Sequence, residues 1–502
     1  MQLFQFLILS ALFQMDTIYS IHDLTIKNFK CYGDNGHTLK FGEELTVIIG
    51  RNGAGKTALL NAVKKAVSII LARDRRKDVR FIGDAKYIRQ NTIKDADARY
   101  NFDYSEGGED YEFPVELKCN GIIRGENIKW NLNKPYKGAK FVMTFREALD
   151  LFLLPFNNGS IYPKLPVLSF FSDSFPHVRN DLSSYEKEIL SNKSENPERR
   201  AGYYNWDDDN SDFHFWSGMF IKSYKKLNDT VTGLVPTKIQ LNSSTNKNTE
   251  LLNKRWENLQ RSQNEITYVS DLLKEFSRPL SAYDSSVFEI ESITAGHHLS
   301  SSGKEVDAIK LTFTNGETRY FDMLPEGYKR LLSIAFEIIY RHFVLNRNLI
   351  LENPDCRPEG IVIIDEIELH LHPILAEEAI ARLRKTFPDI QFIITTHSPT
   401  VISTVYNDGE KVRVIRLTDN HEFMLAEDCF EADYGTTLVM AMGAYNSMRY
   451  TQRLRQHYLD ALHEGKNEEM QNIRRELTAF IGELNSTEEV ADRIIRDWED
   501  FK

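Results

Sequence analysis

The chain of 502 residues is long enough for about three domains, or for one large domain that carries an insertion. Its 41% hydrophobic and 27% charged residues are typical of a globular protein, and its net charge of −11 excludes a generally basic coat for nucleic acid, while a local basic groove stays open. Its four cysteines lie far apart without a CxxC pair, which excludes a cysteine-built zinc site, argues against a disulfide framework and predicts a cytoplasmic protein.

The chain begins with a nearly uncharged apolar stretch. Residues 3–15 could form the core of a signal peptide, but they lack a basic leader and no small-x-small cleavage site follows them. The stretch is also shorter than the roughly 20 apolar residues of a membrane span. We therefore interpret residues 1–15 as an N-terminal extension and expect neither secretion nor a membrane.

Strands followed by a helix are predicted next. Residues 21–29 and 37–41 alternate loosely between apolar and polar side chains. Residues 44–49 include a β-branched run that leads into a glycine, which is typical of a buried strand. Residues 58–71 place their apolar side chains on one helical face. The pattern thus predicts a buried strand, a loop and a helix in direct succession.

The loop between that strand and that helix fits the pattern G-x-x-x-x-G-K-[ST] over residues 50–57. Glycines let successive backbone N–H groups turn towards a phosphate, and a helix N-terminus adds partial positive charge. We expect Lys56 to reach the β- and γ-phosphates of ATP and Thr57 to hold Mg²⁺. The nucleotide-binding residues are predicted to be Asn52, Gly53, Ala54, Gly55, Lys56 and Thr57.

The middle of the chain has fewer clear patterns. Two antiparallel strands are predicted near residues 115–118 and 127–132, and a buried strand over 165–171. The polar and acidic residues 191–216 predict an exposed loop region. Residues 252–276 predict one long helix, a packed lid rather than a coiled coil, because Gln263 and Ser270 break the apolar seam.

Strands and helices alternate in the last third of the chain. We predict helices over residues 327–345, around 374–387 and after Pro399, with strands over 360–364, 391–395 and 412–417. Such alternation favours a parallel α/β sheet that binds its ligand at the carboxyl ends of the strands. The charged residues 447–502 predict two amphipathic helices in a hairpin.

Two of these predicted strands end in residues that can handle phosphate. Four apolar residues precede Asp365 and Glu366, so both carboxylates are expected beside the phosphate loop. Asp365 is predicted to hold Mg²⁺ through water, and Glu366 to orient and deprotonate the attacking water. His397 follows the next strand, where its imidazole could donate to the γ-phosphate.

Other charged groups have competing interpretations. Glu368, His370 and His372 suggest a metal site, but histidines two positions apart share a face only on a strand. The basic run that begins at Arg73 and ends at Arg80 could touch nucleic acid, although a solvated helix end explains it better.

The order and spacing of these motifs resemble the ATP-binding-cassette ATPases of the RecF and SMC type. In that family a Leu-Ser-x-Gly signature from one subunit caps the γ-phosphate of ATP held by the other. Here Gly327 matches the signature glycine, and Pro325 stands where the family has serine. The resemblance thus implies a trans contact without that hydroxyl, weaker or replaced by Tyr328 or Lys329. It also identifies residues 368–373 as the loop that connects the two ATP sites, rather than a metal site.

Within that group the chain is most similar to the Septu ATPases of the PtuA family, including retron-associated forms. The marks are residues 28–32, the run of residues 365–373, Asp433-Tyr434-Gly435 ahead of Met442-Gly443, and the charged C-terminal helices. The resemblance implies an ATPase with ATP and Mg²⁺ as cofactors, a homodimer or higher even oligomer, and a separately encoded HNH-type, PtuB-like nuclease. For retron-associated forms it adds a reverse transcriptase and its RNA/DNA product.

The expected fold is an α/β ABC-type P-loop ATPase head with an inserted α+β lid region and a C-terminal helical hairpin. The expected divisions are 1–15, 16–73 with the phosphate loop, 74–320 as the insertion, 321–446 with the signature and His397, and 447–502 for partner binding. A RecF-like DNA-repair ATPase and the ATPase of a PARIS-like defence system are alternatives. A fused nuclease is disfavoured, because no tandem carboxylate cluster follows His397.

Overall fold

The computed structural model describes two compact units, Met1–Met442 and Gly443–Lys502. The described residues are 19–72, 90–103, 108–144, 164–173, 186–187, 190, 199–209, 213–240, 246–280, 289–299, 305–442, 450–481 and 487–500. The predicted extension and the basic run at 73–80 lie outside them. Among the described residues, no helix combines the length and the apolar character that crossing a bilayer would need.

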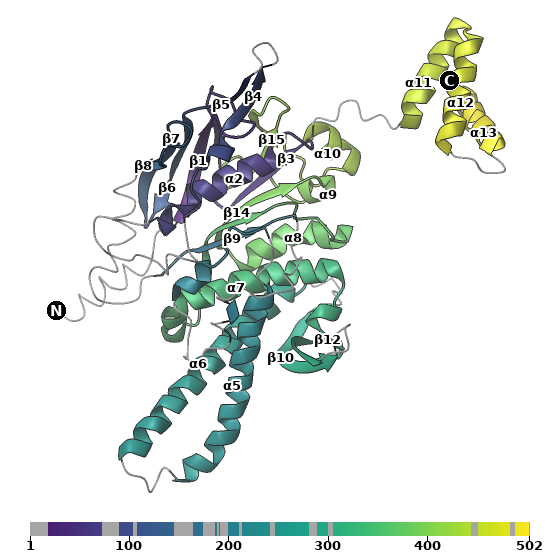
Figure 1. Cartoon of the computed structure of the whole chain (residues 1–502). Coiled ribbons are helices and arrows are strands. Elements are labelled where there is room, and N and C mark those ends of the chain that lie inside the picture. The colour runs from purple at the N-terminus through teal and green to yellow at the C-terminus, as the bar shows by residue number, and fades with distance from the viewer. Residues whose placement is uncertain are drawn as a thin grey trace. The chain divides into compact units, whose positions relative to one another are not determined.

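A six-stranded sheet forms the centre of the first unit (Figure 1). Its strand order is β16-β15-β3-β14-β13-β9, in which β16 alone pairs antiparallel. The predicted parallel α/β sheet is therefore confirmed. The strands are β3 (Leu45–Gly50), β9 (Val167–Phe171), β13 (Glu359–Ile364), β14 (Asp389–Thr396), β15 (Val412–Leu417) and β16 (Phe423–Leu425).

The two faces of this sheet bury different side chains, because successive residues of a strand point to opposite faces. Ile361 and Ile363 of β13 belong to a core shared with the helix after the phosphate loop. Val362 and Ile364 belong to the core on the other face, with the helices α7 (Glu326–Glu352) and α8 (Pro373–Thr386). Both faces are covered, which explains why β13 reads as a continuous apolar run.

An antiparallel sheet of order β2-β1-β6-β7-β8 contributes side chains to the core that contains Ile361 and Ile363. Helix α2 (Lys56–Val67) packs against it, and the Trp130 indole donates to the Ala66 carbonyl over 3.1 Å. Gln391 of β14 connects the two sheets, since its amide accepts from the Ile21 N–H (2.9 Å) and donates to the Ile21 carbonyl (2.8 Å). The strands are β1 (Tyr19–Lys27), β2 (His37–Lys40), β6 (Val115–Ile123), β7 (Glu126–Lys134) and β8 (Val142–Thr144).

Two long helices, α5 (Phe213–Gln240) and α6 (Asn246–Ser277), run side by side and project away from the sheets (Figure 1). The helix predicted over residues 252–276 is confirmed as part of α6, whereas α5 was not predicted. At their base lies a small antiparallel sheet with the strands β10 (Ile290–Leu299), β11 (Glu305–Phe313) and β12 (Thr318–Tyr320).

The exposed loop region predicted over residues 191–216 is wrong for its described part. Tyr203, Tyr204 and Trp206 are buried, and α5 begins at Phe213. These aromatic side chains directly precede the acidic run of residues 207–209, and they fill space beside α7. The Arg341 guanidinium of α7 donates to the Tyr204 carbonyl over 2.7 Å, which fixes this segment against the helix.

The described residues of the second unit, 450–481 and 487–500, form three helices rather than the predicted hairpin of two. They are α11 (Tyr450–Glu464), α12 (Asn467–Ile481) and α13 (Thr487–Asp500). Leu454, Leu477 and Trp498 contribute one side chain from each helix to a shared core. The third helix was missed because its apolar residues are separated by a dense run of charges, although they recur at helical spacing.

Candidate nucleotide-binding site

The phosphate loop, residues 50–57, connects β3 to α2. Gly53 (φ 85°) and Gly55 (φ 106°) adopt backbone conformations that favour glycine. A Cβ atom at Gly55 would lie 2.7 Å from the Cys31 sulfur, so no larger residue fits there. The Tyr32 hydroxyl donates to the Gly55 carbonyl over 3.2 Å. The loop is thus held from behind by the β1–β2 connection.

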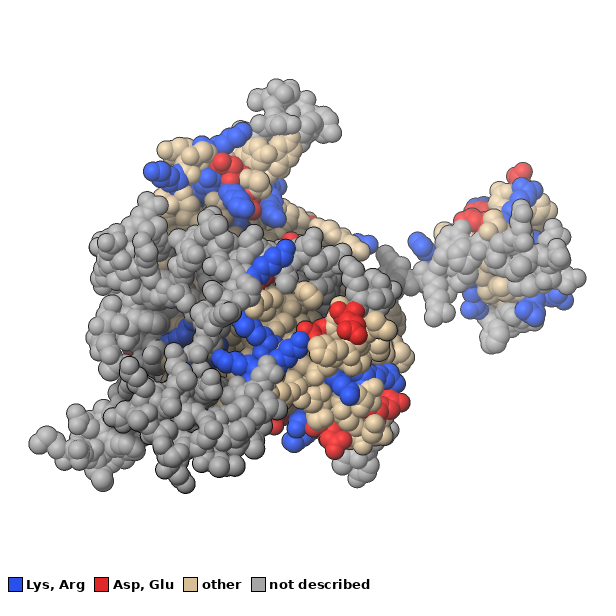
Figure 2. Space-filling model, turned by 60° about the horizontal axis from the view of Figure 1, so that its bottom comes forward, with Lys and Arg blue, Asp and Glu red and all other residues tan. Residues whose placement is uncertain are grey.

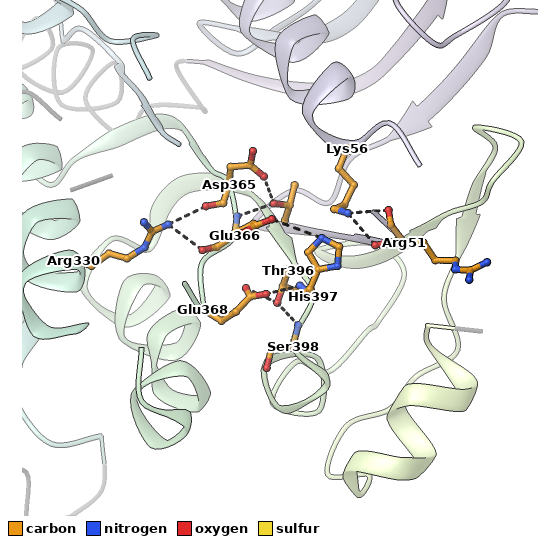
Figure 3. A network of polar contacts seen from close by, with 11 residues as sticks. Arg51, Lys56, Arg330, Asp365, Glu366, Glu368, Thr396, His397 and Ser398 are labelled. Carbon is orange, nitrogen blue, oxygen red and sulfur yellow. Dashed lines mark hydrogen bonds and ion pairs between the residues drawn. The ribbon is translucent and has the colours of Figure 1, made fainter. Parts of the chain in front are cut away.

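The N-terminus of α2 opens directly onto this loop. No acidic side chain lies in its first turn, so the exposed N–H groups and helix dipole there favour an anion. The Lys56 side chain is buried, and its ammonium donates to the carbonyls of Gly50 (2.9 Å) and Arg51 (3.2 Å), as Figure 3 shows. Thr57 is exposed in the same turn. These groups fit a triphosphate with its Mg²⁺.

Asp365 and Glu366 follow the last residue of β13 (Figure 3). The Thr395 hydroxyl at the end of β14 serves both, since it donates to the Asp365 carboxylate and accepts from the Glu366 N–H over 2.8 Å. Burial raises the pKa of Asp365 above its ordinary value. A nearby cation would reverse that cost, so the carboxylate is suited to an ion such as Mg²⁺.

Glu366 combines a strained backbone with a partly exposed carboxylate. Its φ of 48° lies in the left-handed region, which non-glycine residues rarely adopt. Burial, and then the neighbouring charges of Asp365 and Glu368, raise the pKa of Glu366. Its Oε1 lies 3.8 Å from Nε2 of His397. A carboxylate with a raised pKa in such a position is suited to accept a proton from water.

Glu368 fixes the turn that carries His397. Its carboxylate accepts from the His397 N–H (2.5 Å) and from the Thr396 hydroxyl (2.7 Å). Burial, followed by the positive charge of Lys56, lowers the pKa of His397, so its neutral form is favoured. The sequence analysis weighed Glu368 as a metal ligand and favoured a place in the loop between the two ATP sites, whereas its role in anchoring this turn was not predicted. Within the described part of the chain, no group of three or more side chains is suited to hold a metal ion.

Arg330 of α7 reaches the same strand end from the opposite side (Figure 3). Its Nη2 donates to the carbonyls of Asp365 (3.0 Å) and Glu366 (2.9 Å). Burial lowers the pKa of Arg330 to about 10. Sequence reasoning did not assign a role to either Arg330 or Thr395. The available signal for Arg330 was a basic residue at the head of an otherwise apolar helix.

Gly327 lies at the start of α7, which packs against the turn after Glu368. A Cβ atom there would lie 3.0 Å from the His370 carbonyl, so the start of α7 approaches the turn after Glu368. His370 and His372 are both exposed on that turn. The structure therefore brings together Lys56 and the residues of the strand ends, and places Gly327 against the turn that carries His370.

Several solved structures are similar to the chain over about four-fifths of its length. The SMC head domain from Thermotoga maritima is 11% identical, with a TM-score of 0.36 over 82% of this chain and 100% of that one. The recombination mediator RecF is 14% identical, with a TM-score of 0.36 over 82% and 99%.

Relatives by sequence include two proteins that carry retron names. The chain is 25% identical to "Retron Vc95 probable ATPase" of Vibrio cholerae over 74% of this chain and 69% of that protein. It is 24% identical to "Retron Ec83 probable ATPase" of Escherichia coli over 79% and 71%. A third relative, the Septu protein PtuA of Bacillus mycoides, is 29% identical over 34% of this chain and 24% of that protein.

A family of AAA ATPase domains matches residues 20–402, which is more than half of the chain. The match spans the phosphate loop, α7 and both strand ends described above. The relatives named above confirm the similarity to retron and Septu ATPases that the motifs indicated. The chain belongs to the AAA_15 family of AAA ATPase domains.

Proposed function

We propose that the chain binds ATP with Mg²⁺ at the phosphate loop and hydrolyses it to ADP and phosphate. The observation that carries the proposal is the convergence of Lys56, Asp365, Glu366 and His397, from three separate segments, at the carboxyl edge of one sheet. Ligands of parallel α/β sheets bind at this edge. Hydrolysis is proposed to be slow and regulatory.

Each residue has a separate task in this proposal. Backbone N–H groups of Asn52, Gly53, Ala54 and Gly55 and the Lys56 ammonium hold the phosphates, while Thr57 and, through water, Asp365 hold the ion. Mg²⁺, when bound, neutralises charge on the phosphate oxygens. Glu366 takes the proton of the attacking water, and His397 donates to the γ-phosphate.

A second copy of the chain is proposed to complete the site. Gly327 packs against the turn that carries His370, and it stands in the first turn of a long helix, where N–H groups favour an anion. Lys329 in the same turn pairs with Glu326 over 2.7 Å, which reduces the negative charge there. Two chains would thus sandwich ATP between each loop and the opposing α7.

We further propose that the closed dimer regulates a separately encoded nuclease in anti-phage defence. Support comes from the retron and Septu names of the relatives, and from the compact helical unit Gly443–Lys502, which is a candidate surface for that partner. Because nucleotide in the sandwich stabilises only the closed arrangement, ATP can act as a switch.

The test is native mass spectrometry of the chain, purified with its genomic neighbours, with and without ATP. Glu366→Gln should accumulate an ATP-bound even oligomer, because binding persists while hydrolysis stops. Lys56→Ala should show neither nucleotide nor ATP-dependent assembly. Glu377→Gln, which changes an exposed carboxylate on α8, is the matched control. Assembly that ignores both nucleotide and Lys56 would overturn the proposed sandwich.

Direct action on DNA is the second candidate. Figure 2 shows Lys and Arg side chains gathered near the middle of the face that it draws, with acidic side chains beside them. Such a group can contact phosphates although the net charge is −11. DNA binding by the isolated chain that falls steeply with salt, without a stable protein partner, would favour this candidate.

A further inference from the structure

Arg330 is a buried charge that bonds to main-chain oxygens. Its side chain has 0% exposure. Its Nη2 donates to the carbonyls of Asp365 and Glu366, and lies 3.5 Å from the carbonyl of Ser172. These oxygens end two neighbouring strands, β13 and β9. A buried guanidinium is costly, so a site that keeps one has to use its charge and its donors together.

The turn that Arg330 contacts is the one whose geometry needs support. Glu366 has a φ of 48°, and a strained backbone of this kind persists only where its surroundings hold it. The Asp365 N–H donates to the Phe171 carbonyl over 2.7 Å, and the Glu366 N–H donates to Thr395. These bonds fix the N–H groups of the turn. Arg330 fixes the carbonyl groups.

We propose that Arg330 is a positioning residue, which holds the Asp365–Glu366 turn so that the Glu366 carboxylate points at the attacking water. The inference rests on the proposed function, because it assigns Arg330 to the hydrolytic step and not to ATP binding. Arg330 lies near four carboxylates, those of Glu368, Glu366, Asp173 and Asp365. Its charge therefore also compensates the repulsion within this acidic group.

The position of Arg330 on α7 gives it a second consequence. It stands one helical turn after Gly327, on the helix that the proposed sandwich presents to the other subunit's ATP. A shift of α7 would move the donors that hold Glu366. The rate of ATP hydrolysis in each chain therefore depends on the position of its own α7.

The experiment compares Arg330→Lys and Arg330→Met with wild type in the full chain, by ATP affinity and by single-turnover hydrolysis. Lys keeps the charge but not the planar set of donors, and Met removes both. Because a misplaced catalytic group costs about 10²-fold, we expect the rate to fall by about that factor in Arg330→Lys, with ATP affinity within about threefold. Arg330→Met should be slower still.

Arg341→Lys is the matched control, since Arg341 is also buried on α7 and also donates to carbonyls, those of Gly202 and Tyr204. It should lower the melting temperature but leave the hydrolysis rate unchanged. Equal losses of rate in Arg330→Lys and Arg341→Lys would reduce Arg330 to a structural residue and overturn the inference.

The double variant Arg330→Lys/Glu366→Gln separates positioning from general damage. If Arg330 acts through Glu366, adding Arg330→Lys to Glu366→Gln should change the residual rate less than about twofold, because coupled residues are not additive. If Arg330→Lys lowered the rate of Glu366→Gln by as large a factor as it lowers the rate of wild type, the inference would be overturned. If Glu366→Gln itself hydrolyses ATP normally, the proposed function fails instead, so the two failures are distinguishable.

Discussion

Two groups of charged side chains lie within the same unit, and they differ in what they leave open. At the carboxyl edge of the six-stranded sheet, the charges of Lys56 and Glu366 act on one another beside the phosphate loop. Around the middle of α7, the Arg341 and Glu337 side chains have 1% and 4% exposure and bond to one another over 2.7 Å. The first group is suited to a ligand, whereas the second holds α7 against the segment that contains Gly202 and Tyr204.

The two groups differ in how well neighbouring protein groups compensate the cost of burying each charge. At the sheet edge burial lowers the pKa of Lys56 and raises the pKa of Glu366, so both charged forms are disfavoured there. At α7 burial also raises the pKa of Glu337, but there the Arg341 guanidinium donates to the Glu337 carboxylate and to the carbonyls of Gly202 and Tyr204. Removing a charge should therefore affect catalysis in the first group and stability in the second.

Glu366→Gln should have the largest effect on catalysis. We expect the rate of ATP hydrolysis to fall by about 10²- to 10⁴-fold, the usual contribution of a general base, with ATP affinity retained. Phosphate release in single-turnover mode measures the rate, with Glu377→Gln as the control. A wild-type rate in Glu366→Gln would require another base.

Glu337→Ala should have the largest effect on stability. It leaves the Arg341 charge buried without its carboxylate, which costs about 3–5 kcal/mol in the free energy of unfolding. Denaturant titration measures the loss, and the ATP affinity of the folded fraction should stay within about twofold of wild type. A drop in affinity as large as the drop in stability would break the division between the two groups.

Lys56→Ala should have the opposite pattern to Glu337→Ala: it should weaken ATP binding without lowering stability. A charge-assisted hydrogen bond contributes about 1.5–3 kcal/mol, so ATP affinity should fall by about 10- to 150-fold. The melting temperature without nucleotide should not fall, because a buried ammonium is removed. Calorimetric titration with ATP tests this against Lys385→Ala, an exposed position on α8. Unchanged affinity would contradict the assignment of the phosphate loop.

A smaller effect is expected from pH at His342. Burial lowers the pKa of His342 well below its ordinary value of 6.5, and its Nδ1 lies 2.8 Å from the Tyr268 hydroxyl. The unfolded chain therefore binds a proton that the folded chain does not as pH falls below 6.5. Wild type should lose up to about 1.4 kcal/mol per pH unit there relative to His342→Gln. Parallel stability curves would exclude this contribution.

The parts of the molecule that follow from local spacing were predicted well. β3, β13, β14 and β15 were located within one or two residues, because each is an apolar run bounded by a loop signal. The contacts of Thr395 and Arg330 could not be predicted, since they depend on which strand lies beside β13. With Ile394 opposite Ile364, Thr395 falls beside Asp365. That register is set by the tertiary pairing of β13 with β14, which local sequence patterns do not determine.

The errors have a common physical origin. Residues 199–209 and α13 carry many charges, and the composition of a segment says little about the few side chains that it buries. Trp206 and Trp498 each lie among acidic residues, yet both are buried. Aromatic side chains with large apolar area can outweigh several solvated carboxylates.

The order of the strands has a consequence for synthesis on the ribosome. The sheet takes β3, β9 and β13 from segments that begin near residues 45, 167 and 359. A nascent chain that stops before Asp365 contains the phosphate loop but lacks the carboxylates of Asp365 and Glu366. Truncated products would therefore carry half a site and no means of hydrolysis. Translation also has to pass His397 before all of the proposed catalytic residues are present.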